Sequence, residues 1–93
     1  MAQNTTLTLA ANTWTQLTDA NVASITFQNL GSNHMLVKAT TDTTAPTDVT
    51  GAIRYNPGQG ERNAALSDLF PGLAGVRVWA RPSDVTQVMV SHA

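Results

Sequence analysis

Hydrophobic and polar residues alternate in short runs along most of the chain. The clearest run covers residues 22–29, where Ala23, Ile25 and Phe27 are separated by single polar residues. Side chains of a β-strand point to opposite faces in turn, so this pattern predicts a strand with one buried face. Similar runs predict further strands over 5–10, 13–18, 34–40, 53–56, 61–65, 76–81 and 85–92.

Turn-forming residues separate these runs. Residues 30–33 have the length of a hairpin connection, which would pair the strands on either side. Residues 41–51 lack an apolar period and contain Pro46, so they predict a long loop. At the C-terminal end, Pro82–Asp84 separate two strand-like runs that we interpret as a terminal strand pair.

One helical turn is expected near residues 67–70. Ser67 is a candidate N-cap, and Pro71 with Gly72 would end the turn. No helix is long enough to connect parallel strands. The sequence therefore predicts a single all-β domain over residues 1–93, a compact antiparallel β-sandwich (jelly-roll-like) of about 7–8 short strands.

The amino-acid composition supports an all-β fold and limits the kinds of partner that the protein could bind. Threonine is frequent in the first fifty residues and favours strands. The chain has no cysteine, which excludes disulfides and thiolate metal sites. A domain of 93 residues buries little surface alone, so we expect a homo-oligomer. Neither a secretory signal nor a membrane span is expected.

Charge is sparse and balanced. Charged residues make up 12% of the chain, against about 25% in typical domains. Five basic residues stand against six acidic ones, which argues against nucleic acid as a partner. Low charge favours either a surface covered by neighbouring proteins or one solvated by threonine and asparagine, and both interpretations stay open.

Candidate catalytic and metal-binding residues lack a supporting pattern. His34 and His92 lie in no ligand-spaced motif, so both are interpreted as structural. The carboxylates are scattered, and residues 57–60 lack the lysine and following helix of a phosphate-binding loop. We therefore expect no enzyme, no cofactor and no metal. The carboxylates considered are Asp42, Asp48, Glu61, Asp68 and Asp84.

Aromatic residues offer two possible binding surfaces. Trp14, Tyr55 and Trp79 could form a platform that stacks on sugars, although packing in the core is the more ordinary role. Trp79 also alternates with Arg77 and Arg81 on one strand face. Because tryptophan and arginine are enriched at interfaces, this row is the leading candidate for contact with a partner.

Three segments in order carry a family resemblance: LTLAANTWTQLTD near the start, GAIRYNPGQGE in the middle, and LFPG, VRVWAR and VMVSHA at the end. Together they resemble small decoration or head-spike-base proteins of tailed bacteriophages and related gene transfer agents. The resemblance covers residues 7–93 and rests on turns and strands, without catalytic motifs.

The resemblance implies a virion structural protein on the capsid exterior, made in the host cytoplasm. Its partners would be the major capsid protein, further copies of itself, often as a trimer, and a head fibre protein. It implies a capsid decoration (cement) protein or a base for a head spike or fibre. A carbohydrate-binding β-sandwich module is the alternative function.

Overall fold

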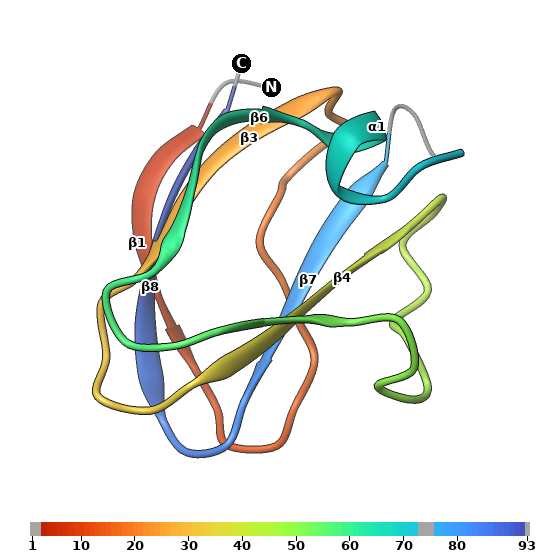
Figure 1. Ribbon diagram of the computed structural model, residues 1–93. Coiled ribbons are helices and arrows are strands. Elements are labelled where there is room, and N and C mark those ends of the chain that lie inside the picture. Colours follow the sequence, from red (N-terminus) through yellow and green to blue (C-terminus); the bar gives the residue numbers. More distant parts are fainter. Residues whose placement is uncertain (1–2, 73–75, 93) are drawn as a thin grey trace.

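The computed structural model describes residues 3–72 and 76–92, so the ends of the predicted domain, residues 1–2 and 93, lie outside it. Eight strands form two four-stranded sheets, and every pair is antiparallel. Figure 1 shows the two sheets packed as a sandwich, with one short helix. The elements are β1 (Gln3–Leu9), β2 (Thr15–Gln16), β3 (Ser24–Asn29), β4 (Met35–Thr40), β5 (Ile53–Tyr55), β6 (Gly60–Ala65), α1 (Leu66–Leu69), β7 (Arg77–Pro82) and β8 (Thr86–His92).

The strand order is that of a jelly roll. One sheet has the order β1-β8-β3-β6 and the other β2-β7-β4-β5. Four pairs, β1·β8, β2·β7, β3·β6 and β4·β5, join the first half of the chain to the second half in reverse order. The chain is thus one long ribbon folded at the 41–52 connection and wrapped into a sandwich, which confirms the predicted fold class.

Alternation in the sequence decides which side chains fill the sandwich. Met35 and Val37 of β4 and Val88 and Val90 of β8 are fully buried, while their neighbours point outward. Phe27 of β3 packs edge-to-face on Tyr55 of β5, with ring centroids 4.8 Å apart. These contacts join the two sheets and place the core between them, as the period-two pattern predicted.

Two predicted strand pairings are wrong. β3 and β4 belong to different sheets, so residues 30–34 cross between the sheets and form no hairpin. β7 and β8 also lie in different sheets, although they follow each other in the chain. Short connections fit both a hairpin and a passage between packed sheets, which is why connection length did not reveal the partner strand.

Three local predictions also need correction. The predicted 13–18 strand is reduced to the two residues of β2. The N-cap of α1 is Ala65 rather than Ser67, with no side-chain hydrogen bond, and the helix covers Leu66–Leu69. Ala23, expected on the buried face, is exposed, because β3 begins only at Ser24, two residues later than predicted. These errors all fall at element ends, where local signals are weakest.

Buried Asn29 ties together the connections at one end of the sandwich. Its side-chain amide donates to the carbonyls of Asn33 (2.8 Å) and Tyr55 (3.2 Å). Its Oδ1 accepts from the Gly31 N–H and from Thr86 Oγ1. All four hydrogen-bonding positions of the amide are therefore used. A Cβ on Gly31 would lie 1.5 Å from Thr86 Oγ1, so only glycine fits beside this network.

Candidate binding face

The outer face of the β2-β7-β4-β5 sheet collects most of the positive charge of the protein. Four of the five basic residues, Lys38, Arg54, Arg77 and Arg81, project from this sheet on the side away from the core. We call this surface the basic face. It consists of the outward residues Gln16, Leu36, Lys38, Thr40, Arg54, Arg77, Trp79 and Arg81.

Strand register arranges these residues in rows across the sheet. Leu36 is opposite Arg54 on one side and Arg81 on the other. In the next row Trp79 is opposite Lys38 and Gln16. Directly opposed side chains start about 5 Å apart, so each row is a continuous surface. The basic face is a sheet surface in which arginines surround an apolar centre.

Only one of these cations has a carboxylate partner among residues 3–72 and 76–92. Lys38 Nζ lies 2.8 Å from Asp48 Oδ1, in the 41–52 connection. The hydrogen bond and charge of Lys38, with the Thr50 N–H, lower the pKa of the Asp48 carboxyl. This exposed pair contributes little to stability. Because Asp48 neutralises Lys38, the positive charge of the basic face that is not neutralised comes from the three arginines.

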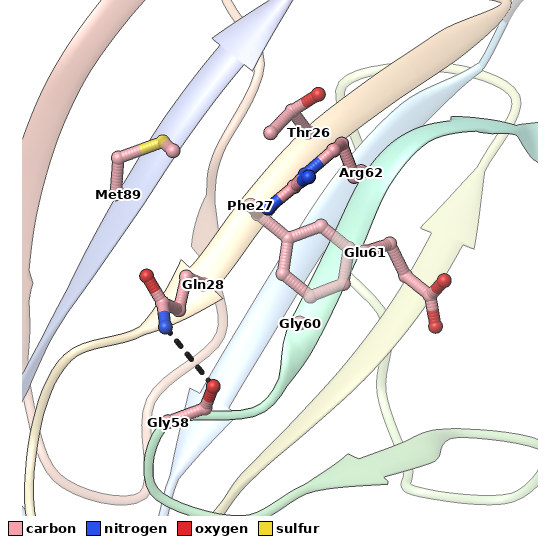
Figure 2. A pocket seen from close by; sticks show the side chains of 8 residues that line it. All are labelled: Thr26, Phe27, Gln28, Gly58, Gly60, Glu61, Arg62 and Met89. Carbon is pink, nitrogen blue, oxygen red and sulfur yellow. Dashed lines mark hydrogen bonds between the residues drawn. The ribbon is translucent and has the colours of Figure 1, made fainter.

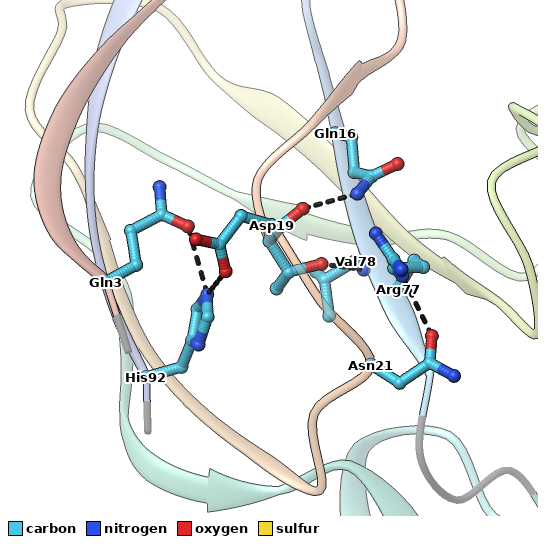
Figure 3. Close-up of polar contacts among 8 residues, drawn as sticks. Gln3, Gln16, Asp19, Asn21, Arg77, Val78 and His92 are labelled. Atoms are coloured by element: carbon cyan, nitrogen blue, oxygen red, sulfur yellow. Dashed lines mark hydrogen bonds and ion pairs between the residues drawn. The ribbon is translucent and has the colours of Figure 1, made fainter. Parts of the chain in front are cut away.

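The arginines keep donors available for a partner. Arg77 Nε donates to Asn21 Oδ1 at 2.8 Å, as Figure 3 shows, and Arg54 Nε donates to Asn56 Oδ1 at 3.1 Å. The guanidinium of Arg81 makes no hydrogen bond or ion pair with the described part of the chain. A guanidinium carries five N–H donors, so all three can still bind carboxylates.

Trp79 supports the basic face from within it. Only 7% of its surface is exposed, although its side chain lies outside the core cluster. Its Nε1 donates to Thr40 Oγ1 at 2.8 Å. Arg77 and Arg81 on either side of it are half-buried. A partner would therefore meet the guanidinium groups before the indole, and the Arg77-Trp79-Arg81 interface stays a prediction.

The predicted row of Arg77, Trp79 and Arg81 is only part of the basic face. Alternation along the predicted 34–40 strand places Lys38 and Leu36 on one face, opposite Met35. What was missing was the register that places Arg54 and Arg81 on either side of Leu36. Alternation gives each strand two faces, but only the pairing of strands shows which outward residues meet.

The outer face of the other sheet differs in chemistry. We call it the neutral face. Its central row is Thr6, Met89 and Gln28, and Arg62 of β6 lies at its margin. Figure 2 shows an open hollow there, where Gln28 Nε2 donates to the Gly58 carbonyl at 3.0 Å. The face comprises Asn4, Thr6, Thr8, Ser24, Thr26, Gln28, Gln87, Met89 and Ser91.

The three aromatic candidates do not form one platform. Tyr55 is buried in the core, and its hydroxyl donates to Glu61 Oε2 at 3.0 Å. Burial, then the hydrogen bond and charge of Glu61, raise its pKa well above the usual tyrosine value. Trp79 is largely covered, and Trp14, just before β2, is half-exposed. Packing therefore accounts for two of the three rings.

His92 has a structural environment. Its Nε2 lies 3.0 Å from Gln3 Oε1 and 3.3 Å from Asp19 Oδ1, as Figure 3 shows. These contacts join β8, β1 and the connection after β2. His34 lies apart from it, in the connection directly before β4. Within the described ranges, no three histidine or carboxylate side chains come close enough to hold a metal ion.

The loop carboxylates have local roles in the backbone. Asp42 accepts from the Thr44 N–H and Asp48 from the Thr50 N–H, each two residues ahead. Asp84 accepts from the Val85 N–H at 2.8 Å. Such contacts are typical of aspartate in turns.

None of the helices in the described part of the chain is long and apolar enough to span a membrane.

No match to this chain was found among protein-family models, curated proteins or solved structures.

Proposed function

We propose that this chain is a virion structural protein that binds the outside of the major capsid protein shell through its basic face. It would act as a capsid decoration (cement) protein or as the base of a head spike or head fibre, after synthesis in the host cytoplasm. The sequence resemblance to small phage decoration proteins motivates the role. The jelly roll supports it, because viral capsid proteins commonly use this architecture.

The observation that carries the proposal is the segregation of charge onto one open sheet. Arg54, Arg77 and Arg81 lack carboxylate partners in the described chain and surround Leu36 and Trp79. Arginine pairs with carboxylates in a planar, bidentate geometry. We therefore infer that the capsid surface bound by this face is acidic, with apolar contact at its centre.

Binding of this kind stabilises the shell by mass action. A protein that binds only the assembled lattice lowers the free energy of that state by an amount that grows with the logarithm of its concentration relative to Kd. The contacts need no covalent chemistry, so no catalytic or cofactor-binding residue is involved. The role thus agrees with the expectation that the chain is not an enzyme.

A direct test is cryo-electron microscopy of purified particles of the virus that encodes this chain. We expect density for an eight-stranded sandwich on the shell exterior, with the β2-β7-β4-β5 sheet facing the capsid protein. Particles without such density, or with the neutral face against the shell, would contradict the proposal.

A charge-reversal experiment tests the face itself. The variant Arg81→Glu should reduce the affinity for shells that lack this protein, measured by co-sedimentation, by at least about tenfold. Arg62→Glu is the matched control, since it reverses a basic residue at the margin of the opposite face. Equal losses in both variants would argue against a role for the basic face. Tight binding of an oligonucleotide through the same arginines would instead indicate a nucleic-acid partner.

The alternative, a carbohydrate-binding module, also uses sandwich folds of this kind. Its aromatic platform would now depend on Trp14, because Tyr55 and Trp79 are buried. Glycan-array binding that Trp14→Ala abolishes would favour this alternative over capsid binding.

A further inference from the structure

Strand β1 forms an unprotected edge of the sandwich. It pairs with β8 along its whole length, from Gln3 opposite His92 to Leu9 opposite Thr86, without a register shift. Its other side pairs with no strand in the described chain. About half of the N–H and C=O groups of an edge strand point away from its neighbour. β1 therefore offers an uninterrupted row of backbone donors and acceptors.

The other three edges carry features that hinder strand pairing. In β6 an extra residue forms a bulge opposite β3, with Asn63 at φ 47°, and Glu61 and Arg62 add charge. β5 has only three residues, including Arg54, and β2 has only two. Bulges, charges and short length are the usual protections of sheet edges.

β1 has none of these protections. Its sequence, QNTTLTL, contains no charge, no proline and no glycine. Thr5 and Leu7 on the inward side are half-buried, because no strand covers them at the edge. A strand added beside β1 would continue the sheet and cover Leu7.

We propose that the β1 strands of two copies pair antiparallel about a two-fold axis at Thr6, joining two sandwiches into one dimer. In this register Thr6 faces its counterpart, Thr5 faces Leu7 and Asn4 faces Thr8. Opposed residues of an antiparallel pair lie on the same side of the sheet, so inward residues meet inward residues. No charged residue is brought opposite another.

A second copy fits this edge better than a charged partner strand. The edge is uncharged and matches itself, which is what an isologous two-fold contact requires. The pairing unites the neutral faces into one eight-stranded sheet and leaves both basic faces free. It closes at two copies, unlike the trimer that the family resemblance implies, and it does not depend on what the basic face binds.

Cysteine cross-linking tests the register, because the chain has no cysteine of its own. Residues directly opposed across an antiparallel pair have Cα atoms about 4.5–5.5 Å apart, within the range of a disulfide. Thr6→Cys should therefore form a covalent dimer on oxidation. Thr8→Cys alone should not, since its two copies would lie about 14 Å apart. A mixture of Asn4→Cys and Thr8→Cys chains should cross-link to each other.

Light scattering and sedimentation of the full chain test the dimer without cross-links. We expect a dimer whose dissociation constant rises about tenfold or more in Thr6→Lys, because two like charges would face each other. Gln87→Lys, on the adjacent strand β8 and on the same face, should leave the dimer intact. Circular dichroism verifies that both variants are folded.

Several results would overturn the proposal. A monomer at every soluble concentration would do so, as would a trimer or an oligomer that Thr6→Lys leaves unchanged. If Thr6→Lys fails to fold, the cysteine variants decide: cross-linking of Thr8→Cys but not Thr6→Cys rejects the register centred on Thr6.

Discussion

The two outer faces of the sandwich share one core but differ in charge. The basic face holds four of the five basic residues, whereas the neutral face has only Arg62 at its margin. The net charge of −1 conceals this difference completely. The net charge of a protein indicates its partners only when the charges are spread evenly over its surface. The strand order of this fold instead concentrates the basic residues on one sheet.

The apolar side chain at the centre of each face differs as well. Trp79 is 7% exposed and is held by Thr40 and its cross-strand neighbours, whereas Met89 is half-buried beside the open hollow. On the basic face a large ring supports long cationic side chains. On the neutral face short polar side chains leave the methionine more accessible. The basic face therefore depends on the packing of Trp79, whereas the neutral face depends less on Met89.

Trp79→Ala should accordingly have the largest effect on stability. We expect a loss of about 3 kcal/mol in the free energy of unfolding, because truncating a buried tryptophan removes extensive packing and leaves a gap. Met89→Ala should cost only about 1 kcal/mol, since less of its surface is buried. Urea denaturation of both variants measures the difference. Similar losses would show that the two faces are packed alike.

Tyr55 tests the connection between the two sheets. It lies in β5, and its hydroxyl donates to Glu61 in β6 of the other sheet. Because its pKa is raised in the folded state, the unfolded chain loses the phenol proton first as pH rises. The contribution of Tyr55 to folding stability should therefore be constant below about pH 10, the usual tyrosine pKa, and fall above it.

The variant Tyr55→Phe should lose about 1 kcal/mol at neutral pH, the typical value of one hydrogen bond, and lack the tyrosine part of the alkaline decline. Tyr55 is the only tyrosine, so tyrosinate absorbance reports this residue alone. Ionisation at the ordinary tyrosine pKa in the folded protein would contradict the buried position. In Glu61→Gln the pKa should stay raised but less so, because burial is the larger cause.

The sequence predicted the content of the fold better than its connections. Alternation identified the buried residues of β3, β4 and β8, because burial of one face is a local property of a strand. It missed that β3 and β4 lie in different sheets, since pairing depends on contacts between distant residues. The basic face shows the same difference between local pattern and strand pairing. The row of Arg77 and Arg81 was predicted, but its union with Arg54 and Lys38 needed the register.

Arg81→Gln should have the smallest effect and the opposite sign. Across its row Arg54 is two strands away, about 10 Å between backbones, which is comparable with the Debye length at about 0.1 M salt. Removing Arg81 should therefore raise stability by roughly 0.3 kcal/mol at low salt and not at all near 1 M salt. Arg62→Gln changes the net charge equally but relieves no cluster, so it should gain nothing. A stabilised Arg81→Gln that binds shells poorly would mean that the basic face is retained for binding at the expense of stability.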